Sequence, residues 1–226
     1  MIFRRYAVYY TPPPGPLAEF GAAWLGWDIA RGRAVPQAPA DLAALPRLTE
    51  TPRRYGFHAT IKPPFALAAG TEPGALGTAV EALARTLPPA RAAGLRLSRI
   101  GAFLALVPEG DNTAIDALAA AVVTGLDTFR APPSEADLAR RRAAGLSPVE
   151  EANLMRWGYP YVLDAFRFHM TLSGALADAE AAEVEHVLRP RLAGVLPRPF
   201  VIGDITLAGE DAEGRFHELS RHALSG

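Results

Sequence analysis

The sequence predicts an α+β fold built from two related lobes, because one order of strands and helices occurs twice. An aromatic strand, a helix and two further strands follow one another over 55–107 and again over 166–223. A His-x-Thr motif marks each repeat, with His58 and His169 lying 111 residues apart. The 226 residues suit one compact domain of two small lobes, and we expect such a duplication to place its shared site between them.

Seven segments, most of them rich in aromatic and β-branched residues, are predicted as strands: 6–10, 55–61, 95–100, 103–107, 166–172, 200–207 and 215–223. Four segments have the apolar spacing of helices: 17–29, 73–87, 112–129 and 178–188. The Pro-rich turn over 11–15 ends the first strand, and four prolines restrict 33–52 to a loop with one short helical turn at most. Pro63 and Pro64 are expected to end the second strand, since proline cannot donate a ladder hydrogen bond.

A helical insertion over 128–161 separates the two repeats and has no counterpart in the first. Ser134 with Asp137 predicts one capped helix, and Ser147 with Glu150 predicts a second, in which a proline occupies the first helical position. We expect the insertion to cover one end of the cleft. The arginines at 140–142 are interpreted as a solvated helix face, with a ligand-facing patch as the alternative.

Composition excludes several classes of function. The chain has no cysteine, which rules out disulfides, thiolate nucleophiles and cysteine-based metal sites. Its formal net charge of -1 argues against a surface for long nucleic acids, which normally carries a basic excess. No apolar run approaches the roughly 20 residues of a membrane span. We therefore expect a cytoplasmic protein that binds a small molecule and no membrane; the sequence indicates no protein partner.

The two motifs place polar side chains on one face of each strand. Side chains alternate along a strand, so His58 and Thr60 point together, as do His169 and Thr171. The apolar residues between and beside them are expected to face the core. They are Phe57, Ala59, Ile61, Phe168, Met170 and Leu172.

Two imidazoles, two hydroxyls and flanking cations suit a phosphate ligand. Hydroxyl groups donate to phosphate oxygens, and neutral and protonated histidine act as base and acid. Continued alternation adds Lys62 and Arg167 to the polar face as candidate phosphate contacts. Tyr159, in a Gly-Tyr-Pro turn, is a candidate stacking residue. A zinc site is the alternative, but neither strand carries an acidic residue on the histidine face, so we expect no metal and no other cofactor.

The paired segments, His58-Ala59-Thr60-Ile61 and His169-Met170-Thr171-Leu172, resemble the repeated signature of the two-histidine (2H) phosphoesterase superfamily. The flanking sequences resemble the branch encoded beside carbon-phosphorus lyase genes in phosphonate-utilisation operons. The resemblance implies a single domain over the whole chain, 1–226, in which two pseudo-twofold-related antiparallel sheets face a central cleft with helices outside. It also implies metal-independent hydrolysis of phosphodiesters, with the two histidines as base and acid and the two threonines holding phosphate oxygens.

The resemblance leaves the substrate and the roles of the two histidines open. The operon association suggests a small cyclic phosphate of ribose. One alternative is an RNA-end enzyme that acts on 2′,3′-cyclic phosphates or 2′-5′ linkages. A second is a nucleotide- or phosphate-binding module without turnover. The near symmetry of the motifs does not say which histidine is the base.

Overall fold

The computed structural model describes residues 2–39 and 42–226. The helices in that part are α1 (Pro16–Leu25), α2 (Leu45–Leu48), α3 (Glu50–Arg53), α4 (Pro73–Ala84), α5 (Thr113–Gly125), α6 (Glu135–Arg142), α7 (Pro148–Trp157) and α8 (Asp178–Leu192), with short 3-10 turns η1 (Asp127–Phe129) and η2 (Leu163–Ala165). None of these helices is long and apolar enough to cross a membrane. The expected loop over 33–52 contains two short helices, and its residues 40 and 41 lie outside the described part.

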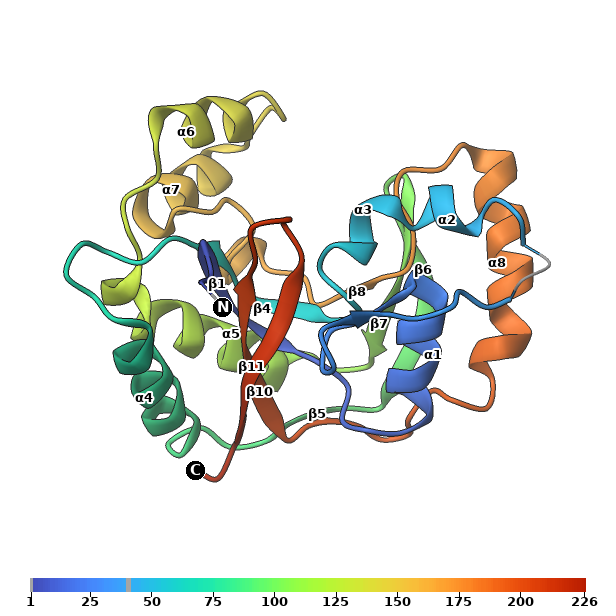
Figure 1. Cartoon of the computed structure of the whole chain (residues 1–226), viewed down its shortest axis with the longest axis horizontal. Helices are drawn as coiled ribbons and strands as arrows, with labels where there is room; N and C mark the ends of the chain where they lie inside the picture. The colour runs from blue at the N-terminus through green and yellow to red at the C-terminus, as the bar shows by residue number, and fades with distance from the viewer. Residues whose placement is uncertain (1, 40–41) are drawn as a thin grey trace.

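Seven strands form one antiparallel sheet in the order β11-β10-β1-β4-β8-β7-β6. They are β1 (Arg5–Tyr10), β4 (Ala59–Phe65), β6 (Gly94–Ile100), β7 (Phe103–Glu109), β8 (Met170–Thr171), β10 (Asp204–Glu210) and β11 (Phe216–Ala223). Two small ladders add β2 (Trp27–Asp28) with β3 (Arg33–Ala34), and β5 (Ala90–Ala92) with β9 (Phe200–Ile202). Helices α4 to α7 lie to one side of the view and α1 to α3 with α8 to the other (Figure 1). The combination of these helices with an antiparallel sheet confirms the predicted α+β class.

The two halves of the sheet join between β4 and β8, the strands that carry the two motifs. Their registered pair is Ala59 with Met170. The hairpin β6–β7 of the first repeat pairs with β8 of the second, while β10–β11 of the second repeat pairs with β1 beside β4. Helix α4 packs on β10 and β11, and α8 packs on β7. Each repeat thus supplies the hairpin that completes the other half, which interlocks the two.

Strand β4 corrects the expected end of the second strand, because it runs through Pro63 and Pro64 to Phe65. Strand β4 pairs with β8 only at Ala59, and beyond that residue its ladder partner is β1. The edge of β4 that faces away from β1 is unpaired there, so residues without an N–H are tolerated. Strand β8 is also shorter than the expected 166–172, since only Met170 and Thr171 have ladder partners and residues 166–169 precede the strand as an irregular segment.

Helix α1 packs against both motif strands on the core side of the sheet. The six apolar residues expected to face the core are all buried there. Trp24 donates its indole N–H to the carbonyl of Leu172, at 2.8 Å. Gly21 lies directly against the Phe57 ring: a Cβ at Gly21 would sit 1.9 Å from Phe57 Cδ1. The position of His58 therefore depends on a close approach of α1 that only glycine allows.

Replacing Gly21 with alanine should destabilise the protein by about 1–3 kcal/mol, because the added methyl forces Phe57 out of its packed position. Gly77 is the matched control, since a Cβ there meets Leu207 at 4.0 Å, an ordinary contact. Gly77→Ala should leave stability unchanged or raise it by up to about 1 kcal/mol through helix propensity. Urea unfolding followed by circular dichroism measures both; equal stability of the two variants would contradict the packing argument.

Candidate functional site

The pairing of β4 with β8 brings the two His-x-Thr motifs side by side. Extending the Ala59–Met170 register by one residue in each direction sets His58 opposite Thr171 and Thr60 opposite His169. Directly opposed residues share a face of a sheet. The four polar side chains therefore lie on one face, while the residues between them are buried on the other.

Both histidines are held in the same way. His58 Nδ1 lies 3.0 Å from the carbonyl of Gly56, and His169 Nδ1 lies 2.8 Å from the carbonyl of Arg167, two residues earlier in each case. A carbonyl only accepts, so Nδ1 carries the proton in both rings and a neutral ring keeps its lone pair on Nε2. The Nε2 atom of His58 accepts from the Thr60 hydroxyl at 3.2 Å.

Gly56 orients the carbonyl that fixes His58. Its φ of +72° lies in the left-handed region, and a Cβ there would come within 2.7 Å of Ile29 Cβ. A side chain at this position would be strained both by the backbone and by the contact. The glycine before the first motif is thus a requirement of the histidine's geometry.

The His58 ring is enclosed by aromatic side chains. The ring centroid of Tyr9 lies 3.9 Å away and that of Tyr55 lies 5.9 Å away. Burial lowers the pKa of His58 to about 4; the bond to Gly56 opposes the shift, and the nearby charge of His169 adds to it. His58 is therefore neutral at pH 7. Tyr9 is fully buried and its hydroxyl has no hydrogen-bond partner among residues 2–39 and 42–226.

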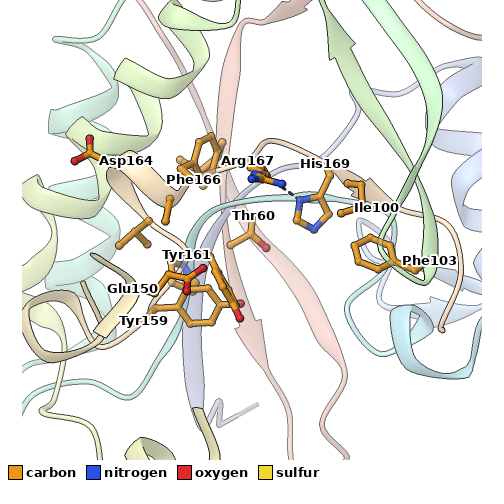
Figure 2. Close-up of a pocket in the computed structure, with 14 residues that line it drawn as sticks. Thr60, Ile100, Phe103, Glu150, Tyr159, Tyr161, Asp164, Phe166, Arg167 and His169 are labelled. Atoms are coloured by element: carbon orange, nitrogen blue, oxygen red, sulfur yellow. Dashed lines mark hydrogen bonds between the residues drawn. The ribbon is translucent and has the colours of Figure 1, made fainter. Parts of the chain in front are cut away.

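A cavity of about 570 Å³ opens on the histidine side of the sheet. Thr60 and His169 line it, together with Arg167 and Tyr159, as the sequence predicts. Figure 2 shows Thr60 between His169 on one side and Tyr159 and Tyr161, at the end of the insertion, on the other. His58 is not part of the lining and reaches it through its hydrogen bond to Thr60; Thr171 also lies outside the lining.

Sequence reasoning missed several residues of this cavity. Phe103, at the start of β7, has its ring centroid 5.7 Å from that of His169. Tyr161 packs edge-on against Tyr159 at 5.7 Å. Glu150 and Asp164 bring carboxylates into the lining. These residues carry no local signal of a site. The pairing of β7 with β8 brings Phe103 to His169, and the packing of the insertion and the segment after it brings the tyrosine and the two carboxylates.

The helical insertion lies at the site through α7 and the loop that follows it. Both expected caps are present: Ser134 accepts from the N–H of Asp137, and Ser147 forms a full capping box with Glu150. The bond from the Ser147 N–H is the main cause that lowers the pKa of Glu150, and the charge of Arg167 contributes less. The carboxylate of Glu150 thus accepts a hydrogen bond at the N-terminus of its own helix.

Lys62 requires a correction, because the structure turns it away from the cavity. Strand β1 advances one residue from Tyr9 to Val8 while β4 advances two from Thr60 to Lys62, so Ile61 is a bulge residue. Tyr9 pairs with Thr60 on the histidine face, whereas Val8 pairs with Lys62 on the core face. The alternation that placed Lys62 beside His58 breaks at this bulge.

Lys62 is instead a buried structural cation. Its ammonium donates to the carbonyl of Val123 in the last turn of α5 at 2.9 Å and lies 3.5 Å from Asp127. Burial lowers its pKa to about 8, and Asp127 opposes that shift. The cavity lining then holds one arginine, Arg167, and two carboxylates. Within the described residues, no three His, Asp or Glu side chains are grouped closely enough to hold a metal ion.

Comparison with known proteins gives both sequence relatives and structural neighbours. The chain is 38% identical over 233 residues to "Ribose 1,5-bisphosphate phosphokinase PhnN" of Janthinobacterium sp. (strain Marseille), which covers 98% of this chain and 51% of the relative. It is 37% identical over 184 residues to the protein of the same name from Laribacter hongkongensis (strain HLHK9), covering 78% of this chain and 41% of the relative. The chain spans about half the length of these curated relatives or less.

A crystal structure of E. coli LigT complexed with 3′-AMP is similar over 100% of both chains, at 15% identity and a TM-score of 0.44. A family model described as "Protein of unknown function (DUF1045)" matches residues 60–217, which is more than half of the chain. The chain belongs to the DUF1045 family.

Proposed function

We propose that the chain hydrolyses a small cyclic phosphodiester of ribose, without a metal, by acid–base catalysis between its two histidines. The observation that carries the proposal is the pairing of β4 with β8, which sets two identically oriented imidazoles and two hydroxyls on one face beside a cavity. General acid–base catalysis needs two such groups flanking the reacting phosphorus.

The environments of the two rings favour His58 as the base. Its low pKa keeps it neutral at pH 7, which is the state that accepts a proton, and a bound phosphate raises that pKa through its negative charge. In the proposed step, His58 Nε2 takes a proton from water while the water oxygen bonds to phosphorus. The ester bond opposite breaks, and protonated His169 gives its Nε2 proton to the departing ribose oxygen. On substrate binding the Thr60 hydroxyl turns from His58 Nε2, which is thereby free to accept the proton of water, and donates to a phosphate oxygen, as does the hydroxyl of Thr171.

The charge of the cavity suits a phosphodiester. A cyclic phosphodiester carries a single negative charge, which Arg167 can offset, whereas the two carboxylates in the lining would repel a monoester dianion. The volume of about 570 Å³ is in the range of small-molecule sites. These features favour a sugar phosphate over a long RNA strand.

The names of the sequence relatives support a ribose substrate. Both are named for a kinase that acts on ribose 1,5-bisphosphate. Hydrolysis of ribose 5-phosphate 1,2-cyclic phosphate at the bond between phosphorus and O2 yields ribose 1,5-bisphosphate. The proposed reaction would thus supply the compound in that name, and a segment similar to this chain is part of the same polypeptide in those relatives.

Replacing His58 or His169 with alanine should lower turnover of ribose 5-phosphate 1,2-cyclic phosphate by at least about 100-fold, because each removes a proton-transfer group. The assay is run with EDTA on a panel that also contains a nucleoside 2′,3′-cyclic phosphate and a 2′-5′-linked dinucleotide. His186→Ala, on the exposed face of α8, is the control and should keep full activity. Full activity in both site variants would refute the catalytic pair.

The part-buried, neutral state of His58 makes stability depend on pH. The unfolded chain binds a proton at His58 near pH 6.5, whereas the folded chain does so only near pH 4. The stabilising contribution is therefore present above pH 6.5 and lost as pH falls towards 4, by about 2 kcal/mol at pH 5.

Urea unfolding at pH 7.5 and pH 5 tests this dependence. His58→Gln should lose about 2 kcal/mol less than the wild type between the two pH values. His186→Gln should behave like the wild type, since that ring is exposed. The same loss in the wild type and in His58→Gln would show that the burial of His58 does not control its protonation.

A further inference from the structure

A second cavity lies directly beside the first and is lined by arginines. Its volume is about 120 Å³, and its charged lining consists of Arg5, Arg130, Arg140, Arg141 and Asp137. We call it the arginine cavity. Consecutive residues connect it to the first cavity, because Pro64 and Gly158 line the arginine cavity while Pro63 and Tyr159 line the first.

Three of the four arginines are fixed by carboxylates. Arg5 forms a two-pronged ion pair with Glu210, Arg130 forms one with Asp127, and Arg140 pairs with Asp137. Arg130 also donates to two backbone carbonyls, so the remaining guanidinium donors belong mainly to Arg5 and Arg140, since a guanidinium has five donors and a carboxylate accepts two of them in a fork. Arg5 and Arg130 are thus held in place before any ligand arrives, whereas the exposed pair of Arg140 restrains its side chain less.

Arg141 differs from the other three because no carboxylate pairs with it among the described residues. Its guanidinium lies instead over the ring of Tyr159, at 4.3 Å from the centroid. Arg141 also forms a side-chain hydrogen bond with Tyr159, and its other N–H groups remain available. The contact connects the arginine cavity to the wall of the first. The sequence predicts a solvated face at 140–142, with a ligand-facing patch as the alternative. Arg140 and Arg142 are exposed, while the fold of the insertion also brings Arg140 and Arg141 to a cavity.

The charges around the arginine cavity leave a positive excess. Five cations are counted here: the four arginines of the lining and Lys62, which is buried behind it and pairs with Asp127. Their carboxylate partners number three, namely Glu210, Asp127 and Asp137. The first cavity shows the opposite balance, with Arg167 against two carboxylates. An anionic group too highly charged for the first cavity is thus favoured in the second.

We propose that the arginine cavity binds the second phosphate of the substrate, a phosphomonoester on the same ribose whose cyclic phosphodiester reacts at the histidines. This inference rests on the proposed function and narrows its substrate to a sugar with two phosphate groups. A volume of about 120 Å³ accommodates one phosphate group and leaves no room for a nucleoside. In this arrangement the Tyr159 side chain lies between the two phosphates. The Arg141 guanidinium stacks on the Tyr159 ring and contacts the phosphomonoester.

The test compares two substrates that differ only in that monoester: ribose 5-phosphate 1,2-cyclic phosphate and ribose 1,2-cyclic phosphate. Arg141→Gln should lower kcat/KM for the first by roughly 10- to 100-fold, the range for a lost charge-assisted hydrogen bond, and leave the second unchanged. Arg142→Gln is the matched control, because exposed Arg142 lies on the same helix but pairs with Glu151 outside the cavity. It should leave both substrates unchanged.

Three outcomes would overturn the proposal. Equal losses for both substrates in Arg141→Gln would show that Arg141 acts only by positioning Tyr159. No preference of the wild type for the substrate with two phosphates would show that the cavity does not contact it. Stimulation of the reaction of ribose 1,2-cyclic phosphate by inorganic phosphate, without that preference, would assign the cavity to a free anion.

Calorimetry with ribose 5-phosphate separates this proposal from the proposed catalysis. If the wild type hydrolyses neither substrate, the proposed function fails, but the cavity is still tested by binding. Binding to the wild type and to His169→Ala that is lost in Arg141→Gln would support the cavity independently of turnover. Absence of binding to the wild type would overturn it.

Discussion

The antiparallel pairing of Ala59 with Met170 is the constraint on which the rest of the structure depends. It joins the two halves of the sheet and sets the register that aligns the two motifs. Because a shift of one residue would exchange the two faces of a strand, this single register decides whether both histidines lie on the cavity side of the sheet or are buried in the core. Helix α1 reinforces it by contacting Phe57 beside one motif and Leu172 beside the other.

Burial gives the two similar motifs different chemical environments. His58 lies against the ring of Tyr9, on the side where β1 and β10 extend the sheet, and burial lowers its pKa. His169 lies where the hairpin β6–β7 ends, beside Phe103 and the open cavity. Strand β1 lies between β4 and β10, but no equivalent strand lies between β8 and β7. This difference breaks the symmetry between the two repeats. A duplicated motif thus acquires two roles from its neighbours.

The sequence was sufficient for the features that depend on local pattern. Alternation around His58 and His169 predicted which side chains face the core, and the Ser147 cap predicted the start of α7. It failed where one strand depends on another. The bulge at Ile61 exists only because β4 pairs with β1, and it moves Lys62 to the opposite face. The order of strands and helices along the chain does not predict the exchange of hairpins between the repeats either, because pairing between strands distant in the sequence decides it.

The near-neutral composition and the basic cavity are two aspects of the same arrangement. Most arginines in the region of the site pair with carboxylates, so they add rigidity without adding net charge, and the formal charge of the chain stays at -1. Such pairs contribute little free energy at an exposed surface but restrict where each guanidinium can point. The unpaired Arg141 then provides a localised positive charge rather than an extended basic surface. Recognition of one compact anion follows from this distribution, whereas a polyanion would need the charges spread along a groove.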